Sequence, residues 1–147
     1  MNAPFFVDTE VILLNCDGVW LSDGIEISHE PTRQLFAKSL QRTPEGWLLK
    51  VGRESKRIEV EDTAYFVAGI DGDPSGGYQL RLSDETHEPL APSSLSYRPG
   101  RLVARLKRGE EAKFLRTPYF ELLKHLEEDS KNYFLRVQGV RVPLASK

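Results

Sequence analysis

The chain has 147 residues, of which 39% are hydrophobic and 29% are charged, which is enough for one folded domain or for two small ones. Its net charge of −2 argues against a protein that coats nucleic acid, so we expect no direct nucleic-acid binding. No apolar run reaches the roughly 20 residues of a membrane-spanning helix, and the single cysteine allows no intrachain disulfide, so we expect a cytoplasmic protein without a membrane partner.

The first predicted element is a hairpin over residues 19–27, because the Asp-Gly pair at 23–24 supplies the positive φ of a tight turn. A helix is expected to begin at Pro31, since the missing amide hydrogen of proline would have no partner in a first helical turn. Residues continue at helical spacing as far as Leu40, and the Thr-Pro-Glu-Gly stretch at 43–46 ends this helix.

Several strands are expected after this helix. They lie at residues 47–51 and 57–61, which form a second hairpin, at 63–70, which is richer in apolar residues, and at 78–82. A glycine-rich loop is expected at 71–77. The stretch 88–99 contains three prolines, and we expect it to connect the two halves of the chain.

The second half opens with a predicted strand over residues 101–107. Strand alternation places Arg101, Arg105 and Lys107 on one face of it. Arg116 continues a similar alternation after the next turn, so it is expected on the neighbouring strand. The result would be a sheet face that carries several cationic side chains.

The remaining predicted elements are one helix and two strands. Thr117 is a suitable cap and Pro118 a suitable first helical residue, and leucines follow at helical spacing. Two short strands are expected around Gln138-Gly139. Each predicted helix is short, so each needs a sheet to pack against.

Landmarks of the first half recur in the second half at a nearly constant distance of 85 to 87 residues. They are a glycine turn, a proline that begins a helix and a five-residue strand, at 23–24 and 108–109, at 31 and 118, and at 47–51 and 133–137. Three different kinds of element recur together, which indicates an internal duplication. We therefore predict an α+β fold of two similar units, each an antiparallel sheet with a helix, over residues 1–90 (with an N-terminal extension) and 91–147.

Charge is distributed unevenly along the chain. Residues 1–73 carry 13 acidic and 7 basic side chains, whereas residues 74–147 carry 9 acidic and 13 basic ones. Opposite charge would help two halves to dock. A cationic surface that captures an anionic ligand is the alternative interpretation.

The sequence contains no recognised catalytic, metal-binding or cofactor motif. Residues 71–76 match the first half of a calcium loop, but Leu82 occupies the position that needs a glutamate. The three histidines, at 29, 87 and 125, have no metal-ligand spacing, and neither a phosphate loop nor a nucleophile elbow is present. We therefore expect no metal, no cofactor and no catalytic residue, which favours a protein that is not an enzyme. A hydrolase with an unrecognised site is left as an alternative.

Glu59, Glu61 and Asp62 place three carboxylates within four residues. Glu61 and Asp62 are candidates to accept hydrogen bonds from the hydroxyl or amino groups of a ligand. The alternative interpretation is structural, because an Asp-Thr pair favours a bend between strands.

Arg101, Arg105 and Arg116 are the second group of candidates for ligand binding. Guanidinium groups on one sheet face suit bidentate capture of a phosphate or a carboxylate. A solvated face, or ion pairs with the acidic half of the chain, would explain the same arginines without a ligand.

The sequence also resembles a known family. The residues that carry the resemblance are Trp20, Gly24, Leu35-Phe36, Leu40 and Arg42, the Ile-Glu-Val-Glu-Asp stretch at 58–62, and the Ala-Lys-Phe-Leu-Arg stretch at 112–116 with Tyr119. From about Asp17 onward, the chain is similar to the family called domain of unknown function 1285.

The resemblance implies a bacterial protein of two repeated structural units, the second similar to a pleckstrin-homology-like sheet. It also implies that a small, nucleotide-like ligand binds between the units, in a role in signal transduction. No enzymatic activity comes with the family.

The sequence thus favours a ligand-binding or regulatory protein. In this hypothesis Arg101, Arg105 and Arg116 pair with an anionic group, Glu61 and Asp62 accept hydrogen bonds, and Trp20 packs near the seam between the units. The alternative is a protein–protein adaptor that recruits a partner through an exposed sheet face or edge.

Overall fold

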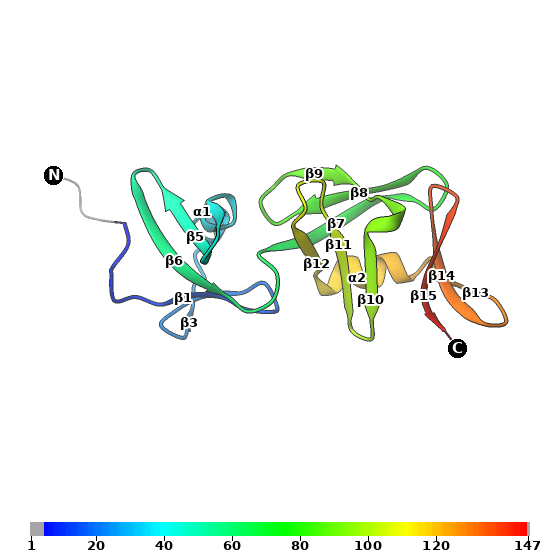
Figure 1. The fold of residues 1–147 in the computed structure, drawn as a ribbon, viewed down its shortest axis with the longest axis horizontal. Coiled ribbons are helices and arrows are strands. Elements are labelled where there is room, and N and C mark those ends of the chain that lie inside the picture. The colour runs from blue at the N-terminus through cyan, green and yellow to red at the C-terminus, as the bar shows by residue number, and fades with distance from the viewer. Residues whose placement is uncertain (1–4, 147) are drawn as a thin grey trace. The chain divides into compact units, whose positions relative to one another are not determined.

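The computed structural model describes residues 5–146, and its fold is α+β (Figure 1). The chain divides into two compact units, Met1–Ala64 and Tyr65–Lys147. This division differs from the predicted boundary after residue 90. The proline-containing stretch 88–99, which we expected to be a connector, contributes a short helix and strands to the second unit.

Unit 1 contains one helix and one mixed sheet. Its elements are β1 (Ile12–Leu14), β2 (Trp20–Ser22), β3 (Ile25–Glu26), α1 (Glu30–Lys38), β4 (Leu40–Thr43), β5 (Gly46–Val51) and β6 (Glu54–Val60). The strand order is β3-β2-β1-β6-β5-β4. All neighbouring strands are antiparallel except β1 and β6.

Unit 2 contains a second mixed sheet and a smaller one. Its elements are β7 (Tyr65–Asp73), β8 (Gly77–Leu82), β9 (His87–Pro89), the 3-10 helix η1 (Pro92–Ser94), β10 (Leu95–Arg98), β11 (Arg101–Arg105), β12 (Glu111–Phe114), α2 (Arg116–Leu123), β13 (Glu127–Glu128), β14 (Asn132–Val137) and β15 (Val140–Ser146). The large sheet has the order β10-β11-β12-β7-β8-β9, and β13-β14-β15 form a separate antiparallel sheet.

The two large sheets share one topology. In each, the first and sixth strands pair in parallel at the centre, the second and third follow on one side, and the fifth and fourth follow on the other. This shared order is consistent with the predicted duplication of a sheet unit. The equivalence it defines pairs β1 with β7 and β6 with β12.

The landmarks of the sequence repeat are present as local structures. The turns at 23–24 and 108–109 close the hairpins β2–β3 and β11–β12, each with a glycine at positive φ, and the prolines lie in α1 and α2. The repeated strands are β5 and β14, and only β5 belongs to a large sheet. The landmarks therefore do not occupy equivalent places in the two sheets.

Helix α1 is shorter than its sequence pattern predicts. Pro31 lies in its first turn as expected, but the helix ends at Lys38. Leu40, which we expected within the helix, instead pairs with Leu49 of β5. Gly46, with φ of 123°, serves the hairpin between β4 and β5. Strand pairing thus prevails over the helical spacing of these residues.

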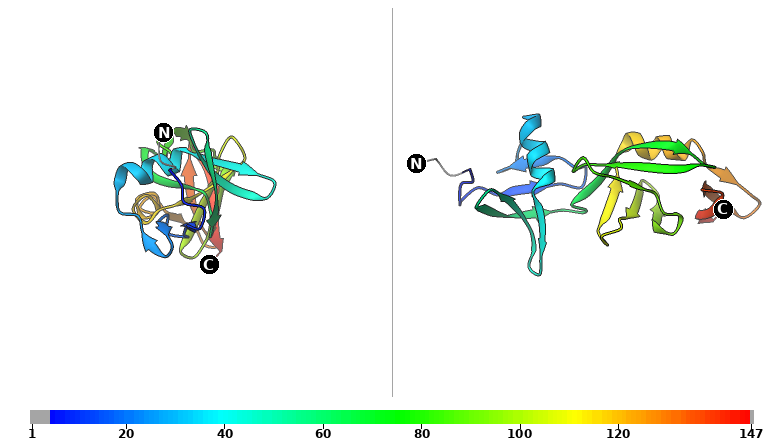
Figure 2. Two further views of the ribbon diagram at one scale, coloured as in Figure 1. Left: turned by 90° about the vertical axis from the view of Figure 1, so that its left-hand side faces the viewer. Right: turned by 90° about the horizontal axis from the view of Figure 1, so that it is seen from above.

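Each unit has its own apolar core. In unit 1, Phe6, Trp20 and Phe36 pack together, and the rings of Trp20 and Phe36 meet edge to face with centroids 5.4 Å apart. In unit 2, α2 packs against β7 and β12 (Figure 2). The fully buried side chains of unit 2 come from both sheets and α2 and include Val67, Leu80, Leu102, Leu122, Leu135 and Val137.

Candidate ligand-binding site

One face of the unit 2 sheet is cationic, and strand register defines it. On β11, Leu102 and Ala104 point into the core, so Arg101, Val103 and Arg105 share the opposite face. Residues directly opposite in the ladders share this face too, and these are Ser96 and Arg98 on β10 and Glu111 and Lys113 on β12. We call this surface the cationic face.

The predicted grouping of Arg101 with Arg105 is confirmed, but Lys107 does not belong to it. Strand β11 ends at Arg105, and Lys107 lies in the following turn. There its backbone N–H donates to the Glu88 carboxylate at 3.0 Å. The strand therefore ends two residues earlier than the alternation suggested.

A pocket of about 240 Å³ lies on the cationic face. Its lining residues come from η1, β10, β11 and β12 and are Ser93, Ser94, Leu95, Ser96, Val103, Arg105 and Glu111. Val103 is only 1% exposed, so it forms an apolar part of the wall beneath longer side chains. We call this the serine pocket.

The serine pocket combines a guanidinium group with three hydroxyl groups. Arg105 is exposed and lies opposite Glu111 in the ladder, yet within residues 5–146 no ion pair joins the two side chains. Guanidinium and hydroxyl groups donate hydrogen bonds to oxygen atoms of anions. The hydroxyl of Ser94 donates to the carbonyl of Ala91 at 2.6 Å, so Arg105, Ser93 and Ser96 are the side chains of this pocket that can donate to a ligand. The arrangement therefore suits a ligand that carries an anionic group.

Volume limits what the serine pocket can hold. Pockets for drug-sized ligands occupy roughly 300–1,000 Å³. At about 240 Å³, this pocket is smaller. It fits a small anion, or the phosphate group of a larger molecule, better than a whole nucleotide.

Arg116 is not on the cationic face, and its predicted place on a strand is wrong. Strand β12 ends at Phe114, and Arg116 begins α2. Pro118 lies in the first turn of this helix, where its missing N–H has no cost, so the helix starts here. The exposed Arg116 guanidinium stacks over the ring of Phe120, with 5.2 Å to the ring centroid.

A hydrogen-bonded pair of tyrosines holds the β10–β11 hairpin, which carries Arg98 and Arg101. The hydroxyl of Tyr119 on α2 donates to Tyr97 and accepts from the backbone N–H of Gly100 in the hairpin turn. Burial, and next the hydrogen bond to Tyr97, raise the pKa of Tyr119. The neutral phenol thus fixes the end of the cationic face to the helix.

The other three predicted ligand-binding residues lie in unit 1. Trp20 is 4% exposed and belongs to the core, which leaves little of its ring for a ligand. Glu61 and Asp62 are exposed in the bend that follows β6. The N–H of Glu61 donates to the carbonyl of Leu14 at 2.9 Å, and its carboxylate accepts from the N–H of Cys16 at 3.3 Å. The bend, which was the structural interpretation, is present.

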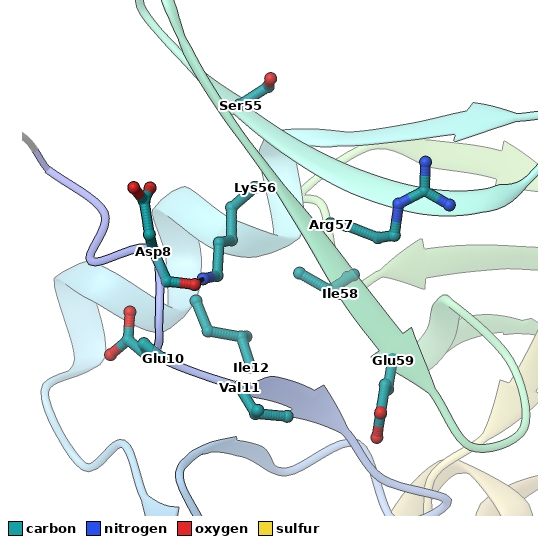
Figure 3. A pocket seen from close by; sticks show the side chains of 9 residues that line it. All are labelled: Asp8, Glu10, Val11, Ile12, Ser55, Lys56, Arg57, Ile58 and Glu59. Atoms are coloured by element: carbon teal, nitrogen blue, oxygen red, sulfur yellow. Dashed lines mark hydrogen bonds between the residues drawn. The ribbon is translucent and has the colours of Figure 1, made fainter.

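Unit 1 contains a larger pocket of about 450 Å³ between the N-terminal segment and β6 (Figure 3). Its lining residues are Asp8, Glu10, Val11, Ile12, Ser55, Lys56, Arg57, Ile58 and Glu59. The Lys56 ammonium group donates to the carbonyls of Val7 and Asp8, at 2.7 and 3.0 Å. A third pocket, of about 290 Å³, is lined mainly by glycines and polar residues of β7 and β8.

Sequence reasoning missed the serines and Glu111 of the serine pocket. Ser93, Ser94 and Ser96 fall in the stretch that we expected to be a connector. A signal was nevertheless present, because Ser96 and Arg98 alternate with Leu95 and Tyr97 as on a strand with two different faces.

Among the residues that the structure describes, no three histidine, cysteine, aspartate or glutamate side chains group closely enough to hold a metal ion. No helix within residues 5–146 is long and apolar enough to span a membrane.

No family model matches the sequence, and no curated protein is similar to it. Two solved structures are similar in fold. One, from Silicibacter pomeroyi, is described as a DUF1285 family protein, where DUF1285 stands for domain of unknown function 1285. It has a TM-score of 0.70 and 17% identity over 92% of this chain and 79% of its own. The other, from Shewanella baltica, is also described as a DUF1285 family protein, with a TM-score of 0.60 and 19% identity over 80% of this chain and 94% of its own.

Proposed function

We propose that this protein, which has the fold of DUF1285 family proteins as its sequence resemblance predicted, is a non-enzymatic binding protein for a small anionic ligand. The ligand's anionic group would bind in the serine pocket, against Arg105. Binding would serve a regulatory or signalling role. The likeness of unit 2 to a pleckstrin-homology-like sheet is part of the same proposal.

One observation supports this function most strongly. Arg105 lies in a concave pocket with Ser93 and Ser96, which places a charged donor and two hydroxyl donors around one small volume. Hydrogen bonds between a guanidinium and an anionic oxygen are roughly twice as strong as those between neutral groups.

The pocket volume refines the nucleotide-like ligand that the family resemblance implies. A phosphate group fits a volume of about 240 Å³, whereas the base and sugar would have to lie outside it. Inorganic phosphate and a nucleoside monophosphate are therefore suitable first probes. The comparison between them tests whether the rest of a nucleotide adds affinity.

Thermal unfolding in the presence of these probes tests the proposal. A ligand at a hundredfold excess over its Kd stabilises the native state by about 2.7 kcal/mol, so we expect a clear rise in Tm. Arg105→Gln should abolish the rise. Arg98→Gln is the matched control, because Arg98 lies on the cationic face but does not line the pocket, and this variant should keep the response. Flat curves with every anion, or an unchanged response in Arg105→Gln, would overturn the proposal.

A separate observation favours the alternative function, a protein adaptor that uses a sheet edge. Residues 54–58 of β6 in unit 1 have an edge that pairs with no other strand of the described residues.

A further inference from the structure

Strand β6 (Glu54–Val60) pairs with different neighbours along different parts of its two edges. It pairs with β5 from Glu54 to Ile58. On its opposite side it pairs with β1 only at Glu59 and Val60. Within residues 5–146, no other strand pairs with that side, so the segment 54–58 has an open edge.

Hydrogen-bond alternation identifies the backbone groups at this open edge. The N–H of Glu61 donates to Leu14 of β1, so the odd-numbered residues of β6 direct their backbone groups toward the β1 side. By the same alternation, Ser55 and Arg57 present their N–H and C=O groups at the open edge. Both residues are exposed and both line the 450 Å³ pocket. Unpaired groups of this kind are a template for another strand.

Side chains, not backbone pairing, hold the N-terminal segment beside β6. The Glu54 carboxylate accepts from the N–H groups of Phe5 and Phe6, and Lys56 donates to the carbonyls of Val7 and Asp8. This arrangement keeps the segment at side-chain distance from β6. The pocket is the space that remains between them (Figure 3).

The lining of the pocket is acidic around an apolar base. Ile12 and Ile58 are 1% and 7% exposed, whereas Asp8, Glu10 and Glu59 supply three carboxylates. Figure 3 shows Lys56 extending toward the N-terminal segment, where backbone carbonyls hold its ammonium group, and Arg57 extending away from that segment. The lining therefore carries three carboxylates against the two cationic groups of Lys56 and Arg57, which leaves a small net negative charge.

We propose that this open edge of β6 binds an extended peptide segment that carries alternating basic and apolar residues. The peptide adds a strand to β6 through the backbone groups of Ser55 and Arg57, which is the β-augmentation mode of recognition. Its apolar side chains contact Ile12 and Ile58, and its basic side chains meet Asp8, Glu10 and Glu59. The volume of about 450 Å³ lies within the range of roughly 300–1,000 Å³ that is usual for ligand pockets. This inference is independent of the ligand proposed for unit 2.

Fluorescence anisotropy with short labelled peptides tests the inference. The probe is a five-residue peptide of alternating lysine and valine, and its control has glutamate in place of lysine. The lysine peptide should bind with saturation, and the glutamate peptide should not. N-methylation of the probe at alternate backbone nitrogens should weaken its binding at least about fivefold, because it removes the strand hydrogen bonds.

Two variants of one residue separate backbone pairing from charge. Arg57→Pro removes the N–H at the open edge, where proline is tolerated, and should weaken binding at least about fivefold. Arg57→Ala keeps that N–H and removes a cationic side chain from the lining, so it should bind the probe at least as tightly as the unaltered protein does. Equal binding by Arg57→Pro and Arg57→Ala, equal binding of the two peptides, no effect of N-methylation, or no binding of the lysine peptide would each overturn the inference. The N-methylated probe keeps the test valid if Arg57→Pro does not fold.

Discussion

The two large sheets share a strand order but differ where their first and sixth strands meet. In unit 1, β1 has three residues and pairs with β6 at two positions. In unit 2, β7 has nine residues and pairs with β12 at three of its four positions. In unit 2 the long β7 pairs with most of β12. In unit 1 the short β1 pairs with only two residues of β6 and leaves the rest of that edge open. The relative lengths of the first and sixth strands therefore determine how much of the sixth strand is left without a partner on that side.

Charge and aromatic residues follow the same division. Residues 1–64 carry 11 acidic and 7 basic side chains, and residues 65–147 carry 11 acidic and 13 basic ones. Both tryptophans, Trp20 and Trp47, lie in unit 1, and all five tyrosines lie in unit 2. Tryptophan fluorescence therefore reports on unit 1 and tyrosine absorbance on unit 2. This separation makes the comparison between the units measurable.

The largest expected effect tests whether the cores of the two sheets contribute equally to the free energy of unfolding. Leu49 of β5 and Leu102 of β11 are both fully buried, on the equivalent fifth strands. Replacement of either by alanine should lower the free energy of unfolding by about 2–5 kcal/mol, through lost contacts and the cavity left behind. Urea unfolding measures both variants. A cost below about 1 kcal/mol at either position would show that the shared topology does not give a similarly packed core.

Two glycines of β7 test how tightly the long hairpin of unit 2 is built. Gly72 has φ of 115°, and a Cβ there would lie 2.1 Å from the carbonyl oxygen of Gly77. We expect Gly72→Ala to cost about 1–3 kcal/mol, because the backbone itself must shift. Gly69→Ala is the matched control, since its Cβ would meet only the mobile end of the Arg81 side chain. Equal unfolding midpoints for the two variants would contradict this account.

Alkaline pH should affect unit 2 before unit 1. Burial raises the pKa of Tyr65, Tyr78 and Tyr119 above the usual 10.0. The fold favours the neutral phenols. Their contribution to the free energy of unfolding is therefore complete below pH 10 and is lost as the pH rises through the pKa values of the folded state. Tyr119→Phe should cost about 1 kcal/mol at neutral pH, because the N–H of Gly100 loses its acceptor, and should reduce the alkaline loss.

Absorbance and fluorescence read this titration separately in the two units. Ionised tyrosine absorbance should rise above pH 10 while tryptophan emission from unit 1 is still that of the folded state. Simultaneous changes in both signals, with the same profile in Tyr119→Phe, would contradict the assignment of the alkaline response to buried tyrosines.

The smallest expected effect concerns the acid side. Backbone N–H groups of Lys131 and Asn132, and then Arg141, lower the pKa of Asp129 from 3.8 to about 2. The ionised carboxylate favours the fold, so its contribution is present above pH 3.8 and is lost as the pH falls through about 2. Asp129→Asn should flatten the acid dependence of unit 2 stability, as tyrosine absorbance would show. An unchanged acid profile would indicate that these hydrogen bonds do not persist in solution.

Local features of the fold could be predicted from the sequence. The Asp-Gly turn at 23–24, the prolines in the first turns of both helices and the strands around Gln138-Gly139 depend on φ preferences and hydrogen bonding within a few residues. The shared face of Arg101 and Arg105 was also predictable, because it follows from alternation within a single strand. These features need no information about distant parts of the chain.

Features set by distant partners could not be predicted. Leu40 fits a helical stripe, and only its pairing with Leu49 shows that it belongs to a strand. The serine pocket combines η1 with three strands whose register brings Ser96, Val103 and Glu111 together. The same register brings Arg105 to the pocket. Arg116 lies on α2 and not on a strand of this sheet. The order of residues along the chain does not show which distant segments become neighbours.

Amide chemical-shift mapping by NMR during a titration with inorganic phosphate tests the proposed binding site most directly. Saturating shifts should centre on Ser93, Ser94, Ser96 and Arg105, should disappear in Arg105→Gln and should persist in Arg98→Gln. Phosphate that causes no saturable shift at these residues, or that acts equally on the Arg105→Gln variant, would contradict a role of the serine pocket in anion binding.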